Sequence, residues 1–154
     1  MSAWYNKNMA FPATYDFNYY KGDTYEFRIY PKKNDGTVFN LSSYQIESNT
    51  SSTIDNVTDS TAPYDSARFT ISTARGTAGV ANKVNCYARI WDDGTHVRCA
   101  IRPEDSATLV AGTEYVYDVE VVKPAGTAGN PESYSLVHTL LTGKITITDQ
   151  VTGA

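Results

Sequence analysis

Few side chains in this chain of 154 residues could do acid–base or metal chemistry. His96 and His138 are its two histidines, and each lies in a predicted strand without a partner at a metal-ligand spacing. The acidic pairs Asp92–Asp93 and Glu104–Asp105 fit turn formation and helix capping. Calcium takes about six to eight oxygen ligands, so Asp92–Asp93 alone does not predict a calcium site. We therefore expect a protein that is not an enzyme and that holds no cofactor and no metal ion.

The two cysteines, Cys86 and Cys99, flank a predicted hairpin turn at residues 92–95. If Asp92 pairs with Thr95, Cys99 faces Ala88 and the two sulfur atoms are diagonal neighbours on one face of the sheet. A register shifted by one residue places them on opposite faces. Two cysteines are too few for a structural zinc site, which takes four ligands. We expect two buried thiols in a reducing compartment.

Tyrosine is the conspicuous residue type, with twelve copies in the chain. Five of them fall on the first two predicted strands: Tyr15, Tyr19, Tyr20, Tyr25 and Tyr30. By strand alternation, Tyr20 and Tyr30 share a face with Glu26 and Arg28. Such a cluster fits ordinary strand packing, a subunit interface or a platform on which a sugar stacks.

The first thirteen residues form a separate aromatic segment. They contain Trp4, Tyr5, Met9 and Phe11 without a clean period, and Pro12 separates them from the first strand. We expect an arm, residues 1–13, that either covers a sheet edge of its own domain or docks on a neighbouring subunit. The candidate interface residues are the arm's Trp4, Tyr5, Met9 and Phe11, together with Tyr20 and Tyr30, because such anchors dominate protein interfaces.

The elements that must position these residues are β-strands. Residues 114–122 and 143–148 alternate apolar and polar side chains, and turn residues recur along the chain. The pattern predicts nine strands, at residues 14–20, 24–30, 44–49, 67–72, 82–92, 96–102, 114–122, 136–141 and 143–148. The last two could be one bent or bulged strand, since Gly143 separates them only weakly. Tight turns are predicted at Asn34–Gly36 and Asp92–Gly94, a helical turn at Pro103–Leu109, and long loops at 49–65 and 73–82.

Size and charge narrow the class of protein. The length fits one domain, residues 14–154 after the arm, with roughly 68–70% of the unfolded surface buried on folding. The formal net charge is −4, from 13 Lys and Arg against 17 Asp and Glu, and no dense basic cluster is visible. We therefore expect no nucleic-acid partner. No run reaches the ~20 apolar residues of a membrane-spanning helix or resembles a secretion signal, so we expect no membrane partner and synthesis in a cytoplasm.

One segment resembles a feature of immunoglobulin-like domains. Leu109, then Gly112, then Tyr115 at the start of a strand resemble the tyrosine corner, in which a tyrosine hydroxyl bonds to backbone a few residues upstream. Either Tyr115 or Tyr117 would hold that position. The expected fold is therefore all-β, an antiparallel Ig-like β-sandwich of about seven to nine strands with an extended N-terminal arm.

Four segments together resemble the small β-sandwich structural proteins of tailed bacteriophages. In order, they are Tyr20–Tyr30 with its Gly22-Asp23, Asp35–Tyr44, Tyr117–Val121 and Thr139–Thr148. The likeness spans residues 14–152. The arm and the Ser/Thr-rich loop at 49–66 depart from the pattern, so the resemblance does not extend to whatever they bind.

The resemblance implies a non-enzymatic virion protein, assembled in the host cytoplasm in multiple copies in the tail, baseplate or neck. Its partners would be other virion proteins and copies of itself. Two alternatives stay open. One is a capsid decoration or cement protein, and the other is a carbohydrate-binding module for host attachment, with a host glycan as its ligand.

Overall fold

The computed structural model describes residues 12–44, 67–76, 83–91, 94–123, 125–126 and 130–151. Several sequence predictions concern residues outside these ranges. They are the arm with Trp4, Tyr5, Met9 and Phe11, the loop at 49–65, the pair Asp92–Asp93, and most of the predicted strand at 44–49. Those predictions stay predictions.

The fold is all-β, as the sequence predicts, and no α-helix occurs in the described residues. The strands are β1 (Ala13–Thr14), β2 (Phe17–Tyr20), β3 (Tyr25–Ile29), β4 (Ala67–Ser72), β5 (Lys83–Ile90), β6 (Val97–Ile101), β7 (Glu114–Lys123) and β8 (Leu136–Thr148). Two 3-10 turns, Ser42–Tyr44 and Asp105–Thr108, accompany them in the described part of the chain.

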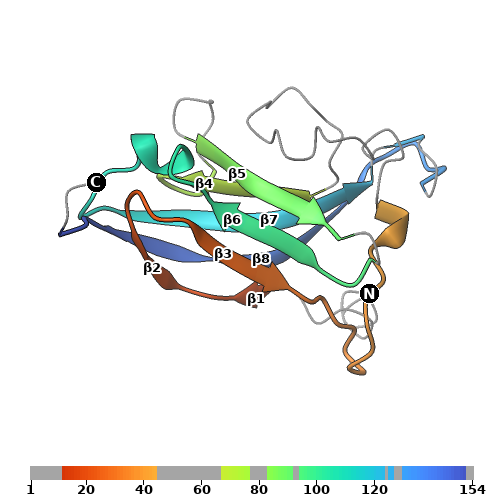
Figure 1. Cartoon of the computed structure of the whole chain (residues 1–154). Helices are drawn as coiled ribbons and strands as arrows, with labels where there is room; N and C mark the ends of the chain where they lie inside the picture. Colours follow the sequence, from red (N-terminus) through yellow and green to blue (C-terminus); the bar gives the residue numbers. More distant parts are fainter. Residues whose placement is uncertain are drawn as a thin grey trace.

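All eight strands belong to one curled sheet, in the order β1-β8-β7-β4-β5-β6-β3, with β2 also paired to β8 (Figure 1). Strand β5 makes the curl possible. Its first half, residues 83–86, pairs with β4, and its second half, residues 87–90, pairs with β6. The sheet is mixed rather than purely antiparallel, because β1 and β2 run parallel to β8.

The curl brings the two edges of the sheet together at an aromatic seam. In the described residues no strand pairing joins β2 to β3, although a short turn connects them. Side chains meet instead. The rings of Phe17 and Tyr25 stack with centroids 4.5 Å apart, and the hydroxyls of Tyr15 and Tyr25 lie 2.9 Å apart. Phe27 then packs against Phe69 at 5.3 Å, so strand β3 faces β4 across the core.

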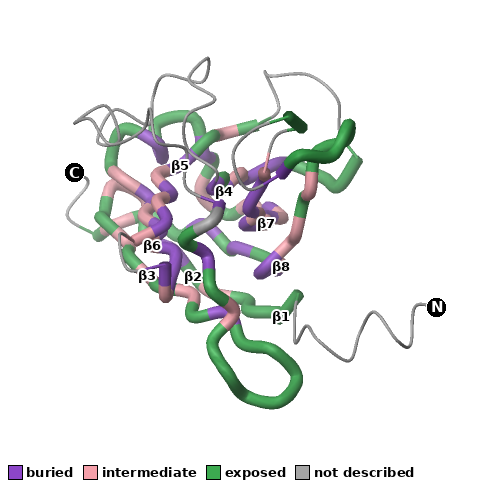
Figure 2. The backbone as a smooth tube through the Cα atoms, turned by 90° about the vertical axis from the view of Figure 1, so that its right-hand side faces the viewer, coloured by how far each residue is buried: buried purple, intermediate pink, exposed green. Residues whose placement is uncertain are grey.

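The core follows from strand alternation. Along β7 the side chains of Tyr115, Tyr117, Val119 and Val121 are buried, whereas those of the intervening residues point outward. Ile145 and Ile147 continue the pattern on β8, as the sequence predicts. Figure 2 shows buried backbone on the strands and exposed backbone in the turns at the ends.

A sharp step between β1 and β2 explains a glycine in the middle of β8. The carbonyl of Tyr15 passes so close to Gly143 that a Cβ atom there would lie 2.0 Å from the carbonyl oxygen. Three hydrogen bonds hold the step against β7 and β8. The Tyr15 amide donates to the Thr142 carbonyl at 3.0 Å, the Tyr117 hydroxyl donates to the Tyr15 carbonyl at 2.5 Å, and the Lys144 amide donates to Asp16 Oδ1 at 2.9 Å.

Two predicted boundaries are wrong, and one alternative that the sequence left open is confirmed. The predicted first strand, 14–20, is broken at Tyr15–Asp16, where the chain steps over Gly143. Residues 136–141 and 143–148 form a single strand, β8, which is the alternative that the sequence left open. Gly143 leaves room for the Tyr15 carbonyl while the pairing with β7 continues. Tyr44 closes a 3-10 turn instead of opening a strand.

Candidate interaction face

The register of three strands places three arginines in one row on the outer surface of the sheet. Arg28 of β3 lies opposite Arg98 of β6, and Arg98 lies opposite Arg89 of β5. The neighbouring row of residues, Phe27, Cys99 and Ala88, points into the core by strand alternation. Three of the six arginines in the chain therefore stand side by side.

A second row on the same side of the sheet lies two residues further along the same strands and is aromatic, and its His96 is buried. Trp91 and His96 are joined by a backbone hydrogen bond of 2.9 Å, from the Trp91 amide to the His96 carbonyl, and their rings stack at 5.9 Å. Tyr30 also packs against His96, with ring centroids 4.7 Å apart. These six residues, Arg28, Arg89, Arg98, Tyr30, Trp91 and His96, form the arginine–aromatic face.

The two rows are connected by cation–π contacts. The guanidinium carbon of Arg98 lies 3.5 Å from the centroid of the Trp91 ring, and that of Arg89 lies 4.9 Å from it. Each such contact contributes about 0.5–1 kcal/mol at an exposed site. The tryptophan thus holds two guanidinium groups in place on the outer surface.

The electrostatics of the row favour an anionic partner. Like charges at directly opposite positions of an antiparallel pair repel each other and destabilise the sheet. Arg28 is exposed, and the Nε atom of Arg98 is buried without a hydrogen-bond partner in the described part of the chain. A guanidinium group offers a planar fork of donors that fits a carboxylate or a phosphate. The face can therefore bind acidic groups and pack rings at the same time.

Of the predicted interface tyrosines, Tyr30 belongs to this face and Tyr20 does not. Tyr30 is 50% exposed and Tyr20 is 53% exposed. Tyr20 ends β2 beside the turn that leads into β3, whereas Tyr30 follows the far end of β3. Tyr20 and Tyr30 therefore lie near opposite ends of β3.

The two candidate tyrosines of the corner make different hydrogen bonds. The Tyr115 hydroxyl accepts from the Val110 amide, five residues upstream, at 3.0 Å. The Tyr117 hydroxyl instead donates to Tyr15 at the chain step described above. Burial raises the pKa of the Tyr117 hydroxyl, with the nearby Asp16 carboxylate adding to the effect.

The cysteines and His138 lie in packed positions of the fold. Cys86 and Cys99 are free, buried thiols, and Cys99 pairs with Ala88 as the predicted register requires. Burial raises the pKa of each thiol, so both are poor nucleophiles at neutral pH. His138 packs edge-on against Phe39 and Tyr44, and burial lowers its pKa. No three His, Cys, Asp or Glu side chains of the described residues gather as a metal site.

Asp105 has a partner that the sequence did not reveal. Both its carboxylate oxygens accept from the Arg102 guanidinium, at 2.9 and 2.8 Å, and the Arg102 amide donates to it as well. The pair holds the 3-10 turn Asp105–Thr108 beneath the end of β6. It is structural, since the Asp105 side chain is only 5% exposed.

The arginine row is the main feature that sequence reasoning missed. The signal was present, because each of the three arginines lies between two apolar residues of a predicted strand. The predicted pairing of Asp92 with Thr95 also places Arg89 opposite Arg98. The pairing of β3 with β6 joins strands far apart in the sequence, so no local signal could have added Arg28.

Comparison with known proteins adds no relative. No protein-family model, no curated protein and no solved structure matches the chain. Among the described residues, no helix has the length and apolar character needed to span a membrane.

Proposed function

We propose that this chain is a non-enzymatic structural protein of a tailed-bacteriophage particle, assembled in multiple copies in the tail, baseplate or neck. The observation that carries the proposal is the arginine–aromatic face, in which three arginines and two large rings are held on the outside of the sheet. Arginine, tyrosine and tryptophan are the residues enriched at interface hot spots. A rigid strand surface of this kind suits a permanent contact with another protein.

We further propose that the curled sheet is an Ig-like sandwich. The bond from the Val110 amide to Tyr115 is the contact that a tyrosine corner makes, at the start of the strand after a connection. Strand β5 changes partners midway, which lets β3 and β6 face β7 and β8 across one core. This arrangement supports the resemblance to phage β-sandwich proteins, and two of the four segments that carry the resemblance lie in β7 and β8.

The packing of Arg98 on the Trp91 ring favours a protein partner over a glycan. Sugar binding needs an exposed ring face on which the sugar can stack, but the guanidinium of Arg98 already lies 3.5 Å from the centre of this ring. An acidic protein surface needs no free ring face, because it would meet the guanidinium groups. Decoration of the capsid is the same kind of function at another position in the particle.

The test is the composition and symmetry of the particle. Mass spectrometry of purified virions of the phage that encodes the chain should find it in many copies. A reconstruction should then place it with six- or twelve-fold symmetry, which corresponds to tail, baseplate or neck. Placement across the icosahedral shell would support decoration instead. Complete absence from purified particles would refute the virion proposal.

A further inference from the structure

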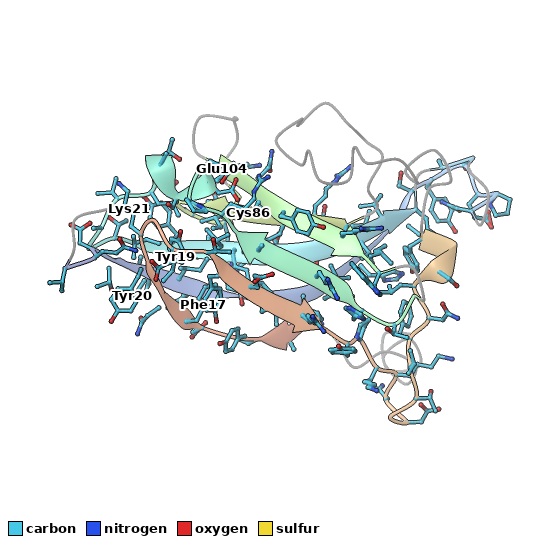
Figure 3. The ribbon with its side chains drawn as sticks, in the orientation of Figure 1. Phe17, Tyr19, Tyr20, Lys21, Cys86 and Glu104 are labelled. Carbon is cyan, nitrogen blue, oxygen red and sulfur yellow. The ribbon has the colours of Figure 1, made fainter. Side chains whose placement is uncertain are left out.

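The end of the molecule around Tyr20 is acidic and partly apolar. The turn after Tyr20 is bound to β8 by a hydrogen bond of 2.8 Å, from the Lys21 amide to the Thr148 carbonyl, and the Gly22 amide donates to Ser106 Oγ at 3.1 Å. These bonds bring three connections together, and Figure 3 shows Tyr20, Lys21 and Glu104 at this end. The acidic pole is defined as the exposed residues Tyr20, Asp23, Glu104, Val110 and Asp149.

The pole differs in charge from the arginine–aromatic face. It carries three carboxylates, with Lys21 as a neighbouring base. Neither Glu104 nor Asp149 forms an ion pair in the described part of the chain, and Val110 exposes 59% of its side chain. Setting aside the three arginines of the face leaves ten basic against 17 acidic residues, a formal charge of −7. A second copy of the chain is therefore an acidic partner for the face.

We propose that the arginine–aromatic face of one copy binds the acidic pole of a second copy. The inference rests on the proposed assembly in multiple copies and says which surfaces meet. Guanidinium groups of Arg28 and Arg98 would bind carboxylates of Glu104 and Asp149, since such pairs form two parallel hydrogen bonds. Tyr30 and Tyr20, with Val110, would supply the apolar area that an interface needs at its centre.

The contact is head-to-tail because the two surfaces differ. They lie at opposite ends of β3, a strand of five residues that spans about 17 Å. A contact between unlike surfaces leaves one face and one pole free in every dimer. Repetition then closes into a ring if the rotation between copies allows it, and grows into a filament if it does not. Both outcomes suit a symmetric particle.

Two charge-reversal variants test the contact. The face variant carries Arg28→Glu and Arg98→Glu, and the pole variant carries Glu104→Lys and Asp149→Lys. A matched control, Arg68→Glu with Lys144→Glu, makes the same charge change as the face variant at exposed positions on β4 and β8. Circular dichroism and thermal unfolding establish that each variant is folded. Sedimentation velocity at low and high salt then measures self-association of the full chain.

We expect wild type and the control to associate, and each variant alone to associate at least tenfold more weakly, because like charges now meet across the contact. An equimolar mixture of the two variants should recover association. The intact pole of the face variant can bind the intact face of the pole variant, and the two reversed surfaces, an acidic face and a basic pole, also carry opposite charges.

Other outcomes overturn the inference. A wild-type chain that stays monomeric at all concentrations would exclude the self-contact, even if the chain is found in virions. A pole variant that associates like wild type would mean that the face binds something other than the pole. If both variants associate normally and only the face variant loses binding to heparin, the face is a site for a polyanionic glycan. If the chain is absent from purified virions but the mixed variants associate as expected, the protein assembles through this contact and is not a virion component.

Discussion

Replacing Gly143 by alanine should weaken the attachment of the N-terminal strands to β8. The new Cβ atom would lie 2.0 Å from the Tyr15 carbonyl oxygen and 2.8 Å from its carbon, so the crossing chain must move away. Three hydrogen bonds depend on its position: those from the Tyr15 amide, the Tyr117 hydroxyl and the Lys144 amide. Figure 1 shows β1 and β2 running beside β8.

The expected cost follows from these bonds. A neutral hydrogen bond contributes about 0.5–1.5 kcal/mol, and one to a carboxylate about 1.5–3 kcal/mol. Alanine restores about 0.5–1 kcal/mol because it is more favourable than glycine in a strand. We therefore expect the free energy of unfolding to fall by about 2–4 kcal/mol. In urea, with a slope of about 1–3 kcal/mol/M, the midpoint should fall by about 1–2 M.

A double-mutant cycle with Tyr117→Phe separates this mechanism from a general loss of stability. In the wild type, Tyr117→Phe removes the bond to Tyr15 and should cost about 1 kcal/mol or more. In the Gly143→Ala background the bond is already broken, so the same change should cost much less. Lys144→Ala, next to Gly143 in β8 but with an exposed side chain, is the control and should change stability by under about 0.5 kcal/mol. Additive costs, or a cost below about 0.5 kcal/mol for Gly143→Ala, would refute the reasoning.

Three further predictions concern named contacts. Arg102→Ala should lower the free energy of unfolding by about 2–3 kcal/mol in urea, because it leaves the buried Asp105 carboxylate without its cation, and Arg102→Lys should recover only part of that loss. Full stability of Arg102→Ala would mean that the pair is not formed. Tyr115→Phe should cost about 1 kcal/mol, since the Val110 amide loses its acceptor, and amide exchange at Val110 should speed up. An unchanged exchange rate would argue against the bond. Burial raises the pKa of Tyr25 to about 12, so its neutral form is favoured in the folded state. The stability that this provides is complete below the ordinary tyrosine pKa of 10 and is lost as pH rises towards 12. Tyr25→Phe should therefore flatten the fall of unfolding free energy between those pH values, and an unchanged slope would contradict the assignment.

Local sequence patterns were sufficient for most strands. Alternation identified the buried set Tyr115, Tyr117 and Val119, because each strand buries one face. The hairpin register between β5 and β6 also followed from its turn residues, so Cys99 was correctly placed opposite Ala88. These features depend on residues close together in the chain.

Features that depend on distant residues were not predictable in the same way. The break between β1 and β2 exists because Gly143, more than a hundred residues away, leaves room for the Tyr15 carbonyl. The parallel pairing of β2 with β8 could not be predicted from the alternation of apolar and polar residues, which reports only on neighbours in the chain. The arginine row likewise needed the long-range pairing of β3 with β6 to bring Arg28 beside Arg98.

The central claim is that the arginine–aromatic face is the surface through which this protein assembles. A reconstruction of the assembled particle or oligomer, at a resolution that shows side chains, tests it most directly. The account predicts protein density packed against Arg98 and Tyr30 in every symmetric copy, with carboxylates at the guanidinium groups. Ordered copies whose arginine–aromatic faces are all open to solvent, with contacts made elsewhere, would contradict it.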